Sequence, residues 1–218
     1  MDDEKDKEYD DPTGTFIKSH EGYSPEVYGD TKGIPTVGYG ANLESPDIAE
    51  TLNTLNLDEQ AIRQGASVDK KSADAIFQAQ RAEKERYFDT INKKDFPDSD
   101  ISENERAALV SMGYNSPRLW GPKLRKMLQM NDDAGVTREI LTGSNKNNVP
   151  GIQKRRLEEA KMYAGDDFEQ IYNSLPPEEK NKIVNTIQQI KNPHERQRVF
   201  QQYPFLTPQT RFTKLRQP

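Results

Sequence analysis

The chain has 218 residues, and 42 of them are Leu, Ile, Val or Phe. This apolar fraction lies close to the boundary between folded and disordered proteins. The formal net charge of −5 comes mainly from residues 1–11, which carry seven acids and two bases, whereas the remaining residues carry 29 of each. We therefore predict an acidic flexible tail over residues 1–12, followed by one domain with a modest core and a small appendage, which excludes a large enzyme.

Cysteine is absent, and the two histidines, His20 and His194, lie far apart in the chain. This composition excludes a disulfide framework, a thiol nucleophile and a thiolate metal site, and it argues against a histidine-dependent triad. The sequence therefore predicts no cofactor and no bound metal.

Membrane and export signals are also missing from the sequence. No apolar run approaches the roughly 20 residues that span a bilayer, and the acidic N-terminus lacks the basic and hydrophobic regions of a signal peptide. We expect a protein that is soluble as made, with no membrane span.

The predicted elements begin with a helix over residues 13–22, which Gly22 and Pro25 terminate. Two β-prone runs, residues 27–28 and 34–39, flank a turn over residues 29–33 and predict a hairpin. Pro35 has no N–H to donate, so its strand should be an edge strand or be broken there.

The rest of the chain is predicted to be helical. Residues 70–91 form one long helix, which Gly65 separates from an earlier piece. Further helices are expected over residues 106–114, 123–130, 134–141 and 150–164, and shorter ones over 167–175, 178–190 and 194–202. A domain boundary is placed near Gly165, so that residues 13–165 form the main domain and residues 166–218 a helical, proline-containing extension.

Two carboxylic acids in the first forty residues are expected to hold opposite charge states. Glu21 falls in the last turn of its helix, beside apolar side chains, and both features favour its protonated form. Asp30 lies in a turn exposed to water and backbone donors, which favour the ionised form. Glu21 therefore suits a general acid and Asp30 a base.

Thr36 lies on the returning strand and can hold a water molecule beside Asp30. An acid, a base and a water-positioning hydroxyl are the groups that hydrolyse a glycosidic bond. Gly38 and Gly40 follow Thr36 and permit a tight backbone beside this group, and no phosphate-loop pattern surrounds them.

These residues resemble a known family. Glu21, Asp30 and Thr36, followed by VGYG, resemble the catalytic signature of phage-type lysozymes, the endolysins of tailed bacteriophages, a family that includes pesticin-like bacteriocins. ALVSMGYN at 108–115 resembles the helix with the family's aromatic-Asn pair, and VPGIQKRRLEEAKMYAG at 149–165 is similar to its terminal Gly, Arg-Arg, Glu helix. The match covers roughly residues 13–165.

The resemblance implies an α+β, mostly helical, two-lobed fold with a small antiparallel sheet in the N-terminal lobe and a helical C-terminal lobe. It implies a muramidase that cleaves the N-acetylmuramic acid to N-acetylglucosamine bond of peptidoglycan in a cleft between the lobes. Glu21 would be the general acid, Asp30 the base and Thr36 the residue that orients the water. Relatives of this type invert the anomeric centre, so the two carboxyl groups are expected more than about 6 Å apart.

The candidate substrate-binding residues are Asn115, Tyr39 and Trp120. Asn115 would face the sugar, although a capping role at its helix end is an alternative. Trp120 could stack on a sugar, but a place in the lobe core is the favoured alternative. Similarly, Arg155 and Arg156 could bind glycan carboxylates, and pairing with Glu158 and Glu159 along their helix is favoured.

The expected partner is the glycan of bacterial peptidoglycan. Residues 112–165 carry 10 bases and 5 acids, a basic surface that suits an anionic wall polymer, while nucleic acid is not expected. Residues 166–218 are offered as an attachment segment for a virion or another protein. The protein would be made in the host bacterial cytoplasm without a signal peptide and act in the periplasm or cell wall, with a virion-associated role left open.

Two other functions remain open on the sequence. One is a non-catalytic lysozyme-fold module that binds the wall or forms part of a virion. The other is a lytic transglycosylase, which needs a catalytic acid but no water-holding aspartate.

Overall fold

A computed structural model of the chain describes residues 12–30, 33–97 and 99–206. Contacts divide the chain into two compact units. The first unit comprises Met1–Pro97 and Val110–Arg118, and the second Asp98–Leu109 and Leu119–Pro218. Apart from Pro12, the predicted acidic tail over residues 1–12 lies outside the described residues.

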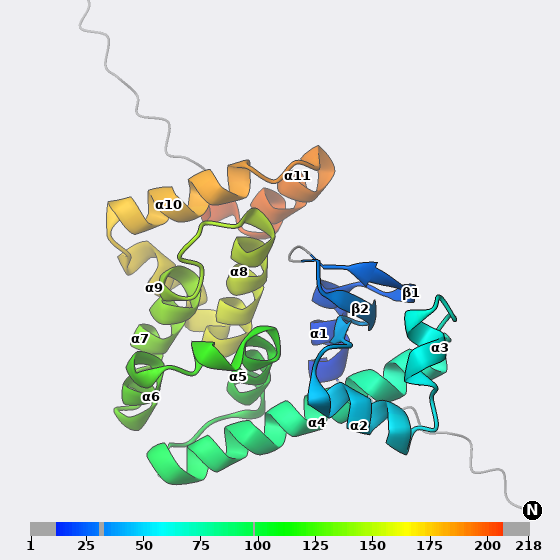
Figure 1. Ribbon diagram of the computed structural model, residues 1–218. Helices are drawn as coiled ribbons and strands as arrows, with labels where there is room; N and C mark the ends of the chain where they lie inside the picture. Colours follow the sequence, from blue (N-terminus) through cyan, green and yellow to red (C-terminus); the bar gives the residue numbers. More distant parts are fainter. Residues whose placement is uncertain (1–11, 31–32, 98, 207–218) are drawn as a thin grey trace, which may run out of the picture. The chain divides into compact units, whose positions relative to one another are not determined.

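The first unit combines a small sheet with helices, as expected from the sequence (Figure 1). Its elements are α1 (Pro12–Glu21), β1 (Ser24–Gly29), β2 (Pro35–Gly38), β3 (Ala41–Asn42), α2 (Pro46–Thr54), α3 (Glu59–Arg63) and α4 (Lys70–Asp95). Helix α5 (Glu103–Asn115) contributes its last residues to this unit. The predicted mostly helical fold with a small antiparallel sheet is confirmed.

The sheet is antiparallel, in the order β1-β2-β3. The predicted hairpin is present, and its register places Tyr28 opposite Thr36 and Gly29 opposite Pro35. Strand β2 lies in the middle of the sheet and not at its edge, but it begins at Pro35, which agrees with the alternative that the strand is broken there. Pro35 is tolerated there because it is the first residue of the strand, and its carbonyl still accepts a hydrogen bond of 2.9 Å from the backbone N–H of Leu43.

Helix α4 supports the sheet from one side. Its start at Lys70 agrees with the prediction, and the Asp69 side chain caps it by accepting a 2.7 Å hydrogen bond from the backbone N–H of Ser72. This hydrogen bond also lowers the pKa of Asp69. Gly38, with φ of +63°, lets β2 approach the helix, because a Cβ there would lie 3.2 Å from the Cβ of Ala73.

Helix α2 was not predicted from the sequence. Its start carries an ordinary signal, Ser45 followed by proline at the first helical position and then Asp47. The helix packs on α4 through Ile48 and Leu52, both of which are buried.

The second unit is helical in its described residues. It contains the beginning of α5, followed by α6 (Pro122–Gln129), α7 (Asp133–Arg138), a π-helical turn η2 (Glu139–Gly143) and α8 (Pro150–Ala164). Three further helices follow Gly165, namely α9 (Phe168–Ser174), α10 (Pro177–Gln188) and α11 (Pro193–Gln202). None of the helices in the described ranges is long and apolar enough to cross a membrane.

The helices after Gly165 pack closely within the second unit. Gly165 does end α8, with φ of +55°, but α9 and α10 both contact α8. Their buried side chains include Phe168, Tyr172 and Ile187. These helices therefore bury apolar surface of the second unit, and only their outer faces are available for an attachment role.

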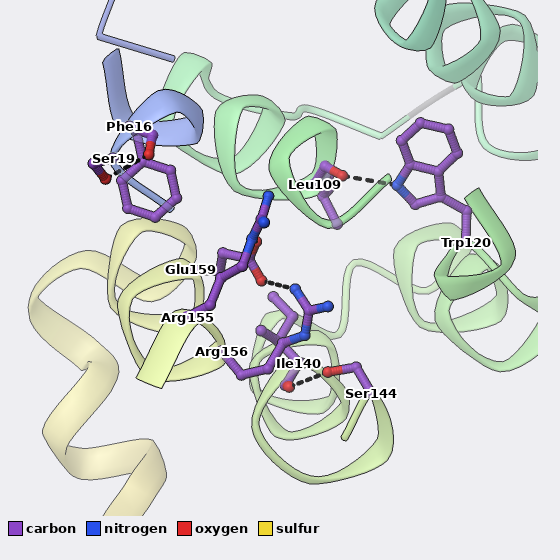
Figure 2. Close-up of polar contacts among 9 residues, drawn as sticks. All are labelled: Phe16, Ser19, Leu109, Trp120, Ile140, Ser144, Arg155, Arg156 and Glu159. Atoms are coloured by element: carbon purple, nitrogen blue, oxygen red, sulfur yellow. Dashed lines mark hydrogen bonds and ion pairs between the residues drawn. The ribbon is translucent and has the colours of Figure 1, made fainter. Parts of the chain in front are cut away.

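A buried charge cluster stabilises α8 (Figure 2). Arg155 Nε donates a 3.0 Å hydrogen bond to Glu159 Oε1, and Arg156 Nη1 bonds the other oxygen of the same carboxylate. All three side chains are buried. The two arginines therefore have the structural role that was favoured from the sequence, because both pair with Glu159 along their helix.

Replacing Glu159 with glutamine should destabilise the fold strongly, since two buried guanidinium groups would lose their carboxylate. Breaking a buried ion pair in this way costs about 3–5 kcal/mol. Urea denaturation followed by circular dichroism measures the loss. The matched control is Glu158→Gln, at the neighbouring, less buried position, which should change stability far less. Equal midpoints for the two variants would show that the cluster contributes nothing particular.

Candidate functional site

Glu21 is the last residue of α1, and its carboxylate lies against the turn that joins β2 to β3. A Cβ built on Gly40, in that turn, would lie 3.4 Å from Glu21 Oε2. Gly40 also has φ of +86°, which side-chain-bearing residues rarely adopt. The glycine therefore allows both the turn and the close approach of a half-buried carboxyl group.

Asp30 follows β1 and is fixed by the backbone of the hairpin. Its Oδ1 accepts a 2.9 Å hydrogen bond from the backbone N–H of Ile34, and its own backbone N–H donates to the Ile34 carbonyl at 3.0 Å. The side chain is half-buried. Its direction is therefore set by the hairpin and does not depend on a flexible rotamer.

Thr36 lies near the start of β2 and is 5% exposed. Its hydroxyl donates a 3.0 Å hydrogen bond to the carbonyl of Ile34. A hydroxyl that donates in this way still has lone pairs that can accept from a water molecule. The peptide groups of Ile34 thus hold the aspartate through the N–H and the threonine through the carbonyl.

Tyr28 joins these residues and was not singled out by the sequence. It lies directly opposite Thr36 in the sheet register, so the two side chains share one face of the hairpin. Burial, followed by the charges of Glu21 and Asp30, raises the pKa of Tyr28 above its usual value of 10.0. The negative charges of both carboxylates therefore act on the same phenol, and this phenol remains protonated at neutral pH.

A simple signal could have identified Tyr28. It precedes Asp30 by two residues in a β-prone run, and alternate residues of a strand point to the same face. Tyr28 is 39% exposed, so part of it is open to solvent.

Tyr39 lies in the packed interior of the first unit. Its ring packs between Tyr23, at 5.4 Å between centroids, and Phe77, at 5.8 Å. Burial and a hydrogen bond to Asp74, which also pairs with Lys18 at 2.5 Å, raise the pKa of Tyr39. The side chain is buried, so its role is to support the turn that Glu21 contacts rather than to offer an open face to a sugar.

Asn115 ends α5 and is exposed. The preceding residue, Tyr114, fixes the helix end, because its hydroxyl lies 3.4 Å from the Tyr39 carbonyl and 3.3 Å from Gln80 Oε1. Its ring also packs on Phe77 at 5.4 Å. Asn115 therefore lies in the first unit, next to Tyr114, which contacts Tyr39. Tyr39 in turn precedes Gly40 in the chain.

Trp120 belongs to the core of the second unit (Figure 2). Its side chain is 2% exposed, and its Nε1 donates a 2.8 Å hydrogen bond to the carbonyl of Leu109. No ring face is left for a sugar, so Trp120 occupies the core position that was favoured from the sequence, and we do not retain it as a substrate contact.

Tyr23 offers the open aromatic ring that Tyr39 and Trp120 lack. It is 41% exposed and follows Glu21 by two residues. Its hydroxyl donates a 2.9 Å hydrogen bond to the Val68 carbonyl, and its ring packs on Tyr39, so the exposed ring is held in place. Among the described residues, no cluster of acidic and histidine side chains is arranged to hold a metal ion.

The profile of the phage lysozyme family matches residues 18–159, about two thirds of the chain. The chain therefore belongs to the phage lysozyme family. The match includes Glu21, Asp30 and Thr36, together with Asn115 and the charge cluster of α8. Membership supports the function of a peptidoglycan muramidase. Comparison with curated protein sequences finds no significant match.

Solved structures similar to this one have the lysozyme fold. An endolysin from Escherichia coli O157:H7 phage FAHEc1 is 22% identical with a TM-score of 0.54, and covers 71% of this chain and 92% of its own. The active form of the P1 phage endolysin Lyz is 19% identical with a TM-score of 0.51, and the match covers 71% of this chain and 84% of the endolysin. The muramidase domain of SpmX from Asticaccaulis excentricus is 16% identical with a TM-score of 0.50, and the match covers 70% of this chain and 94% of that domain.

Replacing Gly40 with alanine should impair wall lysis more than it impairs folding. The new methyl group would lie in contact with Glu21 Oε2, at 3.4 Å, and alanine would be strained at a φ of +86°, so that the turn beside Glu21 would have to shift. We expect lysis of peptidoglycan to fall at least about tenfold, as displacement of a catalytic group by a fraction of an ångström commonly does. Turbidity loss of purified sacculi measures the rate.

The control for this variant is Gly65→Ala, in the loop between α3 and α4, where φ is also positive, at +104°, but no neighbour lies within 4 Å of the added Cβ. It carries comparable backbone strain without contact to Glu21. If both variants lose lysis in proportion to their loss of thermal stability, the contact between Gly40 and Glu21 has no functional weight.

Proposed function

We propose that this protein is a muramidase that hydrolyses the N-acetylmuramic acid to N-acetylglucosamine bond of bacterial peptidoglycan, using Glu21 as acid and Asp30 as base. The observation that carries the proposal is the hairpin geometry. The charges of Glu21 and Asp30 both raise the pKa of Tyr28, which lies opposite Thr36 in the sheet. The peptide groups of Ile34 bind the side chains of Asp30 and Thr36. Membership of the phage lysozyme family supports the same interpretation.

The chemistry is a direct displacement. Glu21 gives its proton to the glycosidic oxygen as the bond between that oxygen and the anomeric carbon breaks. A water molecule forms the new bond to the anomeric carbon, and Asp30 removes one of its protons. The other proton points to the hydroxyl oxygen of Thr36, which is free to accept because the hydroxyl hydrogen is directed to Ile34.

Inversion of the anomeric centre follows from this arrangement, because the water attacks from the face opposite the leaving oxygen. Room for that water requires the carboxyl groups to stand more than about 6 Å apart. Both side chains are half-buried, which shields the charges from bulk water while leaving each a path to substrate.

Substrate contacts are proposed at two exposed positions of the first unit. Asn115 offers an amide that can both donate to and accept from a sugar. Tyr23 offers a ring that is tied down at its hydroxyl, so that little entropy is lost when a sugar stacks on it. Tyr39 contributes indirectly, by supporting both Tyr23 and the turn at Gly40.

The site of action is proposed to be the periplasm or cell wall, where peptidoglycan lies, after synthesis in the host cytoplasm. Two alternatives give different products. A non-catalytic wall-binding or virion module leaves the glycan intact, and a lytic transglycosylase yields anhydro ends. The fixed Asp30 and Thr36 favour hydrolysis, since a transglycosylase has no need to hold water.

The central test replaces each acid by its amide. Glu21→Gln removes the transferable proton, and Asp30→Asn removes the base, while both keep side-chain size. We expect lysis of purified peptidoglycan to fall at least about a thousandfold for Glu21→Gln and about a hundredfold for Asp30→Asn. Thermal unfolding should change little. Glu26→Gln, at an exposed position on β1, is the matched control and should retain full activity. More than a few per cent of activity in Glu21→Gln would remove Glu21 from its proposed role.

Thr36 is tested by two substitutions that differ in one hydroxyl. Thr36→Ala should lose most of the activity, because the water loses an acceptor, whereas Thr36→Ser should keep much of it. The turnover number on soluble peptidoglycan fragments is the relevant measurement, because the threonine acts on the water and not on substrate affinity. A near-normal rate in Thr36→Ala would show that other groups hold the water.

A further inference from the structure

A groove lined by polar residues lies in the second unit, and the helix that forms one wall of it lies beyond the segment that the family profile matches. The groove has a volume of about 440 Å³ and is formed by α10 and by the loop that precedes α8. The family match ends at residue 159, so α10 follows the matched segment in the chain. The residues that line the groove are mostly amides and hydroxyls, and they include Asn148, Asn181, Asn185, Gln189, Lys182 and Thr186.

The amides are arranged in a row along α10. Asn181, Asn185 and Gln189 are spaced four residues apart, so they lie on successive turns of one helical ridge. The opposite side of the helix is anchored, since Ile183 and Ile187 are almost fully buried. Packing therefore fixes which face of α10 the amides occupy.

Asn148 completes the row from the other wall. It has φ of +53°, a left-handed conformation that asparagine tolerates better than most residues. The neighbouring loop is held rigidly, because the Asn145 side chain bonds the Val149 backbone and Gln153. The groove thus has two fixed walls.

Several amides of the same unit are already occupied within the protein. Asn145, Gln153 and Asn192 bond protein groups through their side chains. Within the described part of the chain, no protein group bonds the side-chain amides of Asn148, Asn181, Asn185 or Gln189. Each therefore presents a donor and an acceptor to a ligand.

The charges in the groove cancel. Glu178 and Lys182 lie one turn apart on α10 and are its charged lining residues. The floor is closed by Thr186, whose hydroxyl donates to the Lys182 carbonyl at 2.8 Å. A polyanion would find no excess positive charge here, and the lining contains no large aliphatic or aromatic residue that would bind the apolar face of an amphipathic helix.

From this arrangement we propose that the groove binds the uncharged N-acetylated sugar units of the wall polymer, which are rich in hydroxyl and acetamido groups, and so forms a wall-binding subsite separate from Glu21. Such a ligand offers alternating donors and acceptors that match a row of amides. The C-terminal helices then have two roles, since their inner faces complete the core and the outer face of α10 holds the polymer. This proposal needs only that the ligand be wall glycan, and it does not depend on turnover.

The test uses the full chain carrying Glu21→Gln, so that binding is measured without digestion. The probes are purified peptidoglycan sacculi, in a sedimentation assay, and the soluble tetramer of N-acetylglucosamine, by chemical-shift perturbation of the side-chain amides. Replacing Asn181 and Asn185 together by alanine should weaken binding of sacculi about tenfold, the effect expected for two lost hydrogen bonds. The tetramer should shift the amide signals of Asn181 and Asn185.

The matched control replaces two exposed glutamines of α11, Gln197 and Gln201, by alanine, which removes the same number of amides outside the groove. It should bind sacculi like the parent. Unchanged binding in the Asn181 and Asn185 variant, or an equal loss in the control, would overturn the proposal. A loss caused by Lys182→Ala alone, with the amide variant normal, would also overturn it in favour of an anionic ligand.

The same pair of asparagine substitutions in an otherwise unchanged chain separates this proposal from the catalytic one. Hydrolysis of short soluble peptidoglycan fragments should be unaffected, while lysis of intact sacculi at low protein concentration should slow. If the unchanged chain does not hydrolyse the fragments, the proposed catalytic function is wrong. The binding proposal is then still decided by the sedimentation assay alone.

Discussion

The backbone of Ile34 is the constraint on which the proposed chemistry depends. Its N–H binds the carboxylate of Asp30 and its carbonyl accepts the hydroxyl of Thr36. Neither side chain can turn without losing a bond to the hairpin. The hairpin therefore fixes a base and a water acceptor before substrate binds, which is the condition under which charged groups stabilise a transition state at little reorganisation cost.

Glu21 reaches the same region by a different route. Helix α1 ends at this residue, and its carboxyl group lies beside Gly40, whose φ of +86° forms the turn between β2 and β3. The turn in turn rests on Tyr39, whose ring is packed between Tyr23 and Phe77. A chain of aromatic contacts thus links the position of the acid to the core around α4.

Much of the first unit could be predicted from the sequence, because its signals are local. Gly22 ends a helix, the turn around Asp30 joins two β-prone runs, and Asp69 caps a helix that starts where expected. The middle position of β2 was missed because β3, at Ala41–Asn42, is only two residues long and too short to show an alternating pattern of its own. The core position of Trp120 was favoured from the sequence, whereas its hydrogen bond to the Leu109 carbonyl depends on the packing of the second unit.

The candidate catalytic residues could be recognised from their sequence motif, whereas the residues that support them could be identified only from the fold. Glu21, Asp30 and Thr36 stand out by their spacing, but Tyr28 gains meaning only from its register with Thr36. The amide row on α10 was not singled out from the sequence, and it becomes one wall of a groove only because the loop at Asn148 lies opposite it.

The most direct test of the proposed chemistry is the anomeric form of the first product. Digestion of soluble peptidoglycan fragments, followed in real time by proton NMR, shows which anomer of N-acetylmuramic acid appears before mutarotation. We expect the α anomer from the β-linked substrate, with no signal from anhydro ends. Initial release of the β anomer, or of anhydro sugars, would contradict a water molecule activated by Asp30 and held by Thr36.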